Sequence, residues 1–396
     1  MTNRPENPPR TVVISEQHVF TPYITVGGHQ YARIFAQHGW NVAVISGSFS
    51  AARLLRRDSK VPAANLGIWN NGGREVERRI TNFCFAHLLP RRIRYVPALK
   101  RLSSAGYIPS PRTVLRSLGV AKADLLWLNG NEDWLYRHAI PHSKLVIRII
   151  DNYAGFGSGY RNFHPLMREA LVSADGVFTC SHAVRRLYSQ WRNDIGVVPN
   201  GVDLVHFSQP VPFEPICLHE IPRPRITYVG YVGAWFDLEL VVALARGNPA
   251  WHFVIAGPWD KAPLPQDAIP GNVHVLGRVP YAEVPALLAH SDAGLVPFKQ
   301  CELVQGVSPI KVYEYLAAGL PVVALRWPEL QLEHLPVFLA DGEKQFASAV
   351  ATALRLTTPD KAALRESVRA CSWEQRLKTM LDRVGLPLGP KRAAEY

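Results

Sequence analysis

Short apolar runs alternate along the chain with stretches whose apolar residues recur at helical spacing, and this alternation occurs twice. Strands that alternate with helices are typical of βαβ units in a parallel sheet. The pattern predicts two series of strands, with helices between them. The expected strands are 11–15, 41–46, 124–128, 144–150, 176–180 and 195–198, then 226–230, 251–256, 273–276, 293–297 and 321–324, and the expected helices are 27–38, 166–173, 183–191, 238–246, 282–290 and 309–318.

Two domains accommodate this double series. A length of 396 residues is too great for one ordinary domain and suits two. Between the series lie the segment PNGVD at 199–203 and the stretch 208–224, whose five prolines are typical of a linker. We predict an α/β fold with two Rossmann-like, doubly wound domains that face a cleft, the first over residues 1–205 and the second over 206–372. In such sheets ligands bind at the carboxyl ends of the strands.

Composition narrows the class of protein. Hydrophobic residues make up 47% and charged residues 19% of the chain, which excludes a disordered chain. The five cysteines include no C-x-x-C pair, so they indicate neither a disulfide framework nor a zinc site and favour a reducing compartment. The N-terminus lacks the apolar region of a signal peptide, and no apolar run reaches the roughly 18 residues that span a bilayer. These features predict a cytoplasmic protein.

The net charge of +12 is concentrated in one stretch. Residues 51–120 hold fourteen lysines and arginines against three acidic residues. Basic side chains with apolar neighbours suit an anionic membrane surface, where each cation contributes about 1 kcal/mol. A solvated basic face and a nucleic-acid patch are the alternatives. The apolar residues interleaved with these cations are Leu54, Leu55, Trp69, Phe83, Phe85, Leu88, Leu89, Ile93 and Tyr95.

The segment SPIKVYEYLAAGLPVV at 308–323 is the most informative. Ser308 is expected to be an N-cap and Pro309 the first helical residue. The amide groups at the start of such a helix form a site for a diphosphate. Lys311 and Glu314 are three residues apart on one helix face, where a cation suits a phosphate and a carboxylate suits ribose hydroxyls. An ion pair on a surface helix is the alternative interpretation.

This segment resembles the donor-binding signature of the GT-B superfamily of glycosyltransferases, and specifically the bacterial group 1, family 4-like enzymes. Over about residues 11–385 further passages resemble the family in the same order: the Gly27-Gly28 pair, ADGVFTCS at 174–181 with PNGVD at 199–203, GRVP at 277–280, SDAGLVP at 291–297, and Ser372-Trp373. The resemblance implies sugar transfer from a nucleotide-sugar to an acceptor that the first domain holds. It also implies a last helix, within 373–396, that crosses back to the first domain.

The resemblance assigns residues to the substrates. Residues 278–280 would contact the base, 230–233 the diphosphate, and the loop before the first helix the acceptor. The implied donor-binding residues are Gly230, Gly233, Arg278, Val279, Pro280, Ser308, Pro309, Lys311 and Glu314, and the implied acceptor-side residues are Gly27, Gly28 and His29.

Two departures from the family pattern concern the stereochemistry of transfer. Retaining members carry an E-x7-E pair, and the place of its first glutamate is Gly306 here. The loop YVGAWFD after Gly230 also lacks the Arg and Lys that those enzymes direct at the diphosphate. The passage KLVIRIID at 144–151 is similar instead to xanthan-type exopolysaccharide glucuronosyltransferases, which implies that Asp151 is the general base of an inverting transfer. A carboxylate at a strand end is suited to take a proton from an acceptor hydroxyl. An Asx-turn or a helix cap is the alternative role.

The sequence therefore predicts an enzyme, a hexosyl- or glucuronosyltransferase. The expected donor is a UDP-sugar and the expected acceptor a lipid-linked oligosaccharide or polysaccharide precursor of exopolysaccharide biosynthesis, at the inner face of the cell membrane. No cofactor or metal is expected, since D-x-D and H-E-x-x-H are absent. The alternatives are a retaining family 4-like enzyme of a soluble acceptor, a GT-B nucleotide-sugar epimerase, and a basic nucleic-acid-binding protein.

Overall fold

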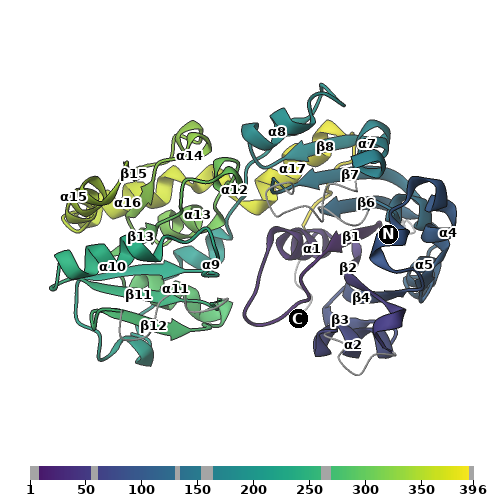
Figure 1. The fold of residues 1–396 in the computed structure, drawn as a ribbon. Coiled ribbons are helices and arrows are strands. Elements are labelled where there is room, and N and C mark those ends of the chain that lie inside the picture. Colours follow the sequence, from purple (N-terminus) through teal and green to yellow (C-terminus); the bar gives the residue numbers. More distant parts are fainter. Residues whose placement is uncertain (1–8, 55–60, 130–133, 153–163, 260–268, 392–396) are drawn as a thin grey trace, which may run out of the picture. The chain divides into compact units, whose positions relative to one another are not determined.

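The computed structural model describes residues 9–54, 61–129, 134–152, 164–259 and 269–391, and it divides into two compact units. Unit 1 consists of Met1–Thr21, Thr25–Val198 and Leu377–Tyr396, and unit 2 of Pro22–Ile24 and Pro199–Arg376. Each unit is a sheet with its own helices (Figure 1). The boundaries expected from the sequence, at 205/206 and 372/373, stay a prediction.

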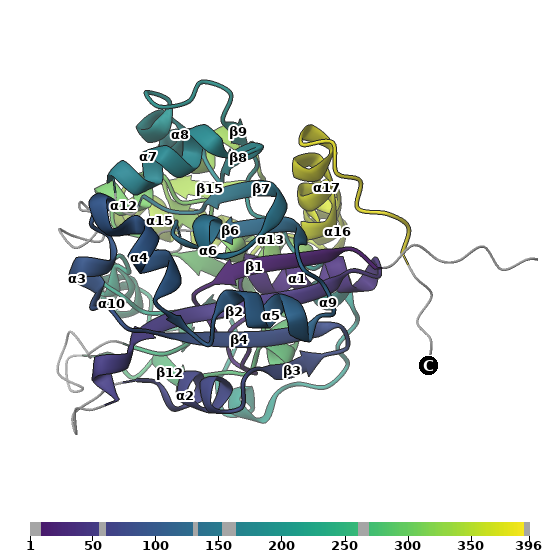
Figure 2. The same ribbon diagram turned by 90° about the vertical axis from the view of Figure 1, so that its right-hand side faces the viewer.

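The sheet of unit 1 has the strand order β3-β4-β2-β1-β6-β7-β8-β9, with β5 paired to β4 (Figure 2). All pairings are parallel except those of β3 and β5 with β4. The strand order reverses at β1, because the chain adds strands on one side of it from β2 to β4 and on the other side from β6 to β9. The strands are β1 (Thr11–Glu16), β2 (Asn41–Ser50), β3 (Arg74–Glu77), β4 (Ile80–His87), β5 (Tyr107–Ile108), β6 (Ala123–Asn129), β7 (His142–Ile149), β8 (Gly176–Thr179) and β9 (Gly196–Val197).

The helices of unit 1 bury their apolar faces against this sheet. Tyr31 and Phe35 on α1 are fully buried, and their rings lie 5.1 and 6.4 Å from the ring of Trp127 on β6. The helices are α1 (Gly27–Gln37), α2 (Ala63–Asn70), α3 (Arg91–Arg94), α4 (Lys100–Ala105), α5 (Pro111–Ser117), α6 (Tyr136–Ala139), α7 (His164–Ser173) and α8 (His182–Tyr188), with the 3₁₀ turns η1 (Ala51–Arg53) and η2 (Pro97–Leu99).

The last helix, α17 (Trp373–Arg383), begins in unit 2, and its residues from Leu377 onward belong to unit 1. Leu377, Met380 and Leu381 are fully buried. Val384 packs on Gly176 of β8, where a Cβ atom would lie 2.5 Å from Val384 Cγ1. The C-terminal segment is therefore part of the core of unit 1.

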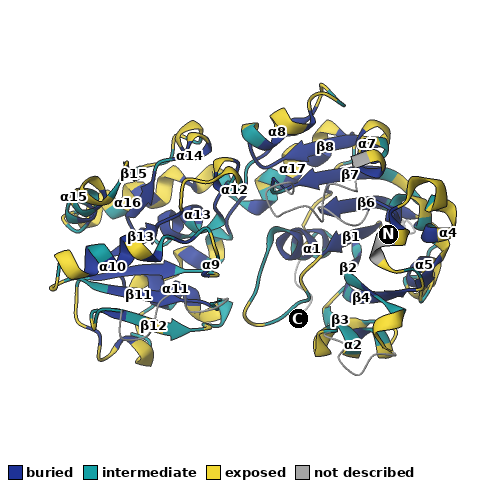
Figure 3. Ribbon diagram, viewed as in Figure 1, coloured by how far each residue is buried: buried dark blue, intermediate teal, exposed yellow. Residues whose placement is uncertain are grey.

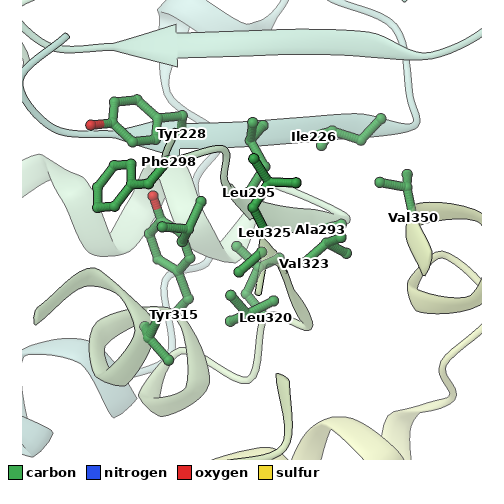
Figure 4. Close-up of a cluster of buried hydrophobic side chains, with 14 of the residues drawn as sticks. Ile226, Tyr228, Ala293, Leu295, Phe298, Tyr315, Leu320, Val323, Leu325 and Val350 are labelled. Carbon is green, nitrogen blue, oxygen red and sulfur yellow. The ribbon is translucent and has the colours of Figure 1, made fainter. Parts of the chain in front are cut away.

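Unit 2 has an all-parallel sheet in the order β12-β11-β10-β13-β14-β15, which reverses between β10 and β13. Its core is shown in Figure 4, where Tyr228, Phe298 and Tyr315 lie together at one end. The elements are β10 (Arg225–Val229), β11 (His252–Ala256), β12 (Val273–Gly277), β13 (Ala293–Val296), β14 (Val322–Leu325), β15 (Val337–Ala340), α9 (Leu204–Ser208), α10 (Leu238–Gly247), α11 (Val284–Ala289), α12 (Glu302–Gln305), α13 (Ile310–Ala317), α14 (Pro328–Leu332), α15 (Glu343–Ala353) and α16 (Thr358–Ser367), with the 3₁₀ turns η5 (Ile216–Leu218), η7 (Tyr281–Glu283) and η8 (Arg369–Cys371).

The α/β class with parallel sheets is confirmed, but the interpretation of the basic stretch 51–120 was partly wrong. This stretch contains β3, β4 and β5, and β4 pairs with β2 inside the sheet. Phe83, Phe85 and Tyr95 are buried in the core, so these rings are not available to a membrane. Leu55 lies outside the described residues.

Candidate functional site

The site in unit 2 lies where the strand order reverses, at the carboxyl ends of β10 and β13. Glycines follow the neighbouring strands and let their ends approach closely. A Cβ atom on Gly257, after β11, would lie 1.9 Å from the carbonyl oxygen of Gly230, after β10, and both glycines have φ near +145° (+147° and +145°). Only glycine is compatible with both constraints. The backbone at these two glycines therefore carries no side chains, which would allow a ligand to approach it closely.

Lys311, in the first turn of α13, reaches this bare backbone. A Cβ atom on Gly230 would lie 3.3 Å from Lys311 Nζ. The ammonium group is 5.2 Å from the ring centre of Tyr228 and 4.8 Å from that of Phe298, within the range of cation–π attraction. Burial lowers the pKa of Lys311 to about 8, against the raising effect of Glu314. The structure thus brings together Gly230 and Lys311, two residues implied for the diphosphate.

Glu314 lies one turn further along α13. Burial raises its pKa to about 7, Lys311 lowers it, and the charge of Asp203 raises it again. Within the described part of the chain, neither the Lys311 ammonium nor the Glu314 carboxyl forms a hydrogen bond or an ion pair. Two desolvated groups without polar partners gain most from a ligand that supplies the missing hydrogen bonds.

The start of α13 differs from the expectation. The helix begins at Ile310, Pro309 is its N-cap, and no side chain caps it. The Ser308 hydroxyl accepts a hydrogen bond from the backbone N–H of Asn200 at 3.3 Å, and Asn200 Nδ2 donates to the Ser308 carbonyl at 2.6 Å. The predicted capping by Ser308 was therefore wrong, because this side chain is directed to the PNGVD segment.

A second contact holds α13 from the side. The Tyr313 hydroxyl donates a hydrogen bond to Glu333 Oε2, just beyond α14. Burial raises the pKa of Glu333, while hydrogen bonds with Tyr313 and Ser308 and the charge of Arg376 act in the opposite direction. Sequence reasoning missed Glu333, Asn200 and Asp203 as parts of this site, and the position of Asn200 and Asp203 in the PNGVD segment was the available signal.

The remaining residues implied for the donor lie on the same edge of the sheet. Arg278 is exposed, and Val279 and Pro280 are partly exposed in the loop after β12. Gly233, in the loop after β10, lies against Trp235, whose ring would be 2.8 Å from a Cβ atom at Gly233. Their contacts with a nucleotide stay a prediction.

In unit 1, Asp151 lies two residues beyond the end of β7 and is partly exposed. Burial raises the pKa of its carboxyl to about 6, although the charge of Arg148 opposes this. The glycine-containing loop expected to follow it falls within 153–163, outside the described residues. A carboxyl that titrates near neutral pH suits a general base.

The strand order of unit 1 reverses between β1 and β6, and Glu16 and Asn129 are the last residues of these strands. Glu16 Oε1 accepts hydrogen bonds from the N–H groups of Gln17 and His18 at 2.8 and 3.3 Å, and Oε2 accepts one from Asn129 Nδ2 at 3.3 Å. Burial raises the pKa of Glu16. Sequence reasoning missed this group, although a glutamate at the end of an apolar strand was a visible signal.

The Glu16 carboxylate explains the predicted Gly-Gly loop. The helix α1 begins at Gly27, and a Cβ atom on Gly28 would lie 2.1 Å from Glu16 Oε2. The buried His29 forms a hydrogen bond through Nε2 to the carbonyl of His18 at 2.9 Å. Gly28 and His29 therefore pack against the loop after β1, and their contact with an acceptor stays a prediction.

The described residues contain no candidate membrane-spanning helix and no candidate metal site. None of their helices is both long and apolar enough to cross a membrane. In the same ranges, no group of three or more His, Cys, Asp or Glu side chains is arranged to hold a metal ion.

Part of the second unit is similar to a known protein family. Residues 223–355 match the model of the family described as Glycosyl transferases group 1. This match lies within unit 2 and spans about a third of the chain. Over 150 residues the chain is 31% identical to the "Putative teichuronic acid biosynthesis glycosyltransferase TuaH" of Bacillus subtilis (strain 168). That alignment covers 35% of this chain and 36% of the relative, so the chain matches about a third of the relative's length.

Solved structures of glycosyltransferases share the fold of the whole chain. Sucrose-phosphate synthase from Thermosynechococcus elongatus has a TM-score of 0.61 at 15% identity, over 95% of this chain and 96% of that one. Anabaena Alr3699/HepE, in complex with UDP and glucose, has a TM-score of 0.62 at 14% identity, over 95% and 99% of the two chains. The GT-B fold and the resemblance to group 1 glycosyltransferases are thereby confirmed.

Proposed function

We propose that this protein transfers a sugar from a UDP-sugar, bound by unit 2, to a lipid-linked oligosaccharide or polysaccharide precursor, bound by unit 1. The observation that carries the proposal is the pair Lys311 and Glu314, desolvated and without polar partners beside the bare backbone at Gly230. This pair lies within the residues that match the glycosyltransferase family. The HepE complex with UDP and glucose supports a nucleotide-sugar donor.

Each donor-side group has a distinct task in this proposal. The ammonium of Lys311 and the free N–H groups in the first turn of α13 bind the diphosphate. The ionised Glu314 carboxylate accepts hydrogen bonds from the ribose hydroxyls, one turn away. We propose no metal ion in the transfer, so turnover is expected to persist in excess EDTA.

Asp151 is proposed to be the general base of an inverting transfer. The acceptor hydroxyl must lose its proton as it attacks the sugar, and a carboxylate with a raised pKa at a strand end can take it. The glycine at position 306, in place of a second glutamate, supports inversion. Determination of the product's anomeric configuration by NMR tests this part.

A membrane-bound acceptor is supported by the surface of unit 1. Within the basic stretch, Leu88 and Leu102 are each 59% exposed, and Ile93 is 43% exposed. Exposed aliphatic side chains among arginines and lysines suit the interface of an anionic membrane, here its cytoplasmic face. The name of the Bacillus subtilis relative supports a cell-surface polysaccharide as the product.

A turnover assay tests the proposal. UDP release from several UDP-sugars is measured with and without a library of lipid-linked and soluble acceptors. We expect that an acceptor stimulates the release of UDP and that the sugar is found on the acceptor. Release that no acceptor changes, or conversion of the donor without release, would contradict transfer and favour hydrolysis or epimerisation.

A further inference from the structure

Unit 1 has a basic pocket among its helices. The pocket has a volume of about 510 Å³ and lies between the end of α4, the start of α5, α6 and the start of β7. Its lining includes the start of β7 and the end of α4, where the Ser103 carbonyl forms a hydrogen bond with Nε2 of His87, the last residue of β4. Its polar lining includes Ser104, Ser110, Arg112, Arg137, His138 and His142.

A second pocket continues the first. It has a volume of about 420 Å³, shares Arg112 and Pro141 with the first pocket, and adds Arg116. Among the described residues that line the two pockets, none is acidic. Together they form one groove with three arginines, which we call the basic groove.

Arg137 is a fixed member of the basic groove. Its side chain is 8% exposed, Nη2 lies 2.5 Å from Glu169 Oε1, and Nη1 donates to the Glu169 carbonyl at 3.1 Å. Lys100 on α4 also pairs with Glu169, at 2.9 Å. Glu169 thus pairs with Lys100 and Arg137, whereas Arg112 and Arg116 have no acidic partner among the described residues, and their charge favours an anionic ligand.

Apolar side chains are exposed on the segments that supply part of the groove's lining. Leu102, on the helix that supplies Ser104 to the lining, is 59% exposed. Ile108, two residues before Ser110, is 40% exposed, and Leu99 is 36% exposed. Figure 3 shows exposed residues along α4. Aliphatic chains beside arginines match a lipid, whose phosphate and acyl region are adjacent, whereas single-stranded nucleic acids require aromatic stacking partners.

We infer that the basic groove binds the headgroup phosphate of an anionic phospholipid, with Arg112 and Arg116 on the phosphate and Leu102 and Ile108 in the interface. This inference rests on the membrane association in the proposed function and adds a specific site to it. The site is separate from the proposed donor and acceptor residues. It would hold unit 1 against the membrane that contains the proposed lipid-linked acceptor.

Vesicle flotation with a matched pair of variants tests the inference. The full chain is floated with phosphatidylcholine vesicles that contain or lack phosphatidylglycerol, as wild type, as Arg112→Ala/Arg116→Ala and as Arg185→Ala/Arg186→Ala. The control arginines are exposed on α8 of the same unit and line neither pocket. Binding to the mixed vesicles is expected to weaken about 30-fold in the groove variant, since each cation contributes about a factor of five, and to change little in the control. Thermal melting verifies that both variants fold.

Three results would overturn the inference. In the first, vesicle binding weakens equally in both double variants. In the second, vesicle binding does not weaken in the groove variant. In the third, inorganic phosphate or glycerol phosphate occupies the groove while the protein stays bound to the vesicles. Stronger binding of a duplex oligonucleotide than of the vesicles would likewise assign the groove to another ligand. Calorimetry with UDP reports on unit 2 alone, so failure to bind UDP would contradict the proposed function and leave the flotation result interpretable.

Discussion

The two units reverse their strand order in the same way, yet the groups at the two reversal points are in opposite states. At β10 and β13 of unit 2, Lys311 and Glu314 are desolvated and have no polar partner in the described chain. At β1 and β6 of unit 1, the Glu16 carboxylate is occupied on both oxygens by the chain itself. The first arrangement favours a ligand, and the second stabilises the protein.

This difference explains where we place the chemistry of unit 1. Because Glu16 is already satisfied by Gln17, His18 and Asn129, it has little to gain from an acceptor hydroxyl. The carboxyl of Asp151 is one strand further, after β7, and is partly exposed. We therefore expect the reactive carboxylate of unit 1, Asp151, to lie beside the reversal point of that unit. In unit 2 the donor-binding groups lie at the reversal point itself.

The largest expected effect is that of Asp151→Asn. Loss of a general base is expected to lower turnover by roughly 10²–10⁴-fold while the affinity for UDP stays nearly unchanged. Asp382→Asn, an exposed aspartate of the same unit, is the control and should leave turnover unchanged. If Asp151→Asn kept wild-type turnover while Glu16→Gln lost it, the assignment of the two carboxylates would be reversed.

The second test addresses unit 2. Lys311→Ala is expected to weaken UDP binding by about 1–3 kcal/mol, the range for charge-assisted hydrogen bonds. Isothermal calorimetry measures it, with the exposed Lys344→Ala on α15 as a control of equal charge change. Equal UDP affinity in wild type and Lys311→Ala would remove Lys311 from the donor site.

The third test concerns the closed reversal point of unit 1. A Cβ atom at Gly28 would displace the Glu16 carboxylate from its hydrogen bonds, so Gly28→Ala is expected to lower the free energy of unfolding by about 1–3 kcal/mol. Gly67→Ala, in α2 with open space around it, should instead stabilise by roughly 0.5–1 kcal/mol. Denaturant titration compares them. If Gly28→Ala lowered the free energy of unfolding equally in wild type and in Glu16→Ala, the contact with Glu16 would not be the cause of the destabilisation.

Most elements and the class of fold could be predicted, because parallel strands buried on both faces appear as continuous apolar runs. The strand β4 in the stretch 51–120 could not, because Thr81, Asn82 and His87 leave it only a short apolar run, FCFA at 83–86. Local patterns also located Lys311 and Glu314. They could not reveal that Ser308 turns to Asn200, that Tyr313 binds Glu333, or that Glu16 lies against Gly28, since these contacts join residues far apart in the sequence.

The smallest expected effect, the pH dependence of UDP affinity, examines the open reversal point directly. The pKa of Lys311 is about 8, so above this pH the free protein loses the ammonium charge, and binding of the diphosphate must be coupled to uptake of a proton. Affinity is then expected to fall by up to about tenfold per pH unit as pH rises beyond that value.

The acid side depends on Glu314. Its pKa is about 7, so below this pH the carboxyl becomes protonated and loses its strength as an acceptor for the ribose hydroxyls, and affinity falls again. Calorimetry across pH should give a maximum between the two values. Glu314→Gln should flatten the acid limb and move the alkaline limb to lower pH, since the Glu314 charge raises the pKa of Lys311. Lys311→Met should flatten the alkaline limb and move the acid limb to higher pH, since the Lys311 charge lowers the pKa of Glu314. If both variants kept the wild-type pH profile of UDP affinity, the protonation of Lys311 and Glu314 would not be coupled to donor binding. The two reversal points would then differ only in how their side chains pack.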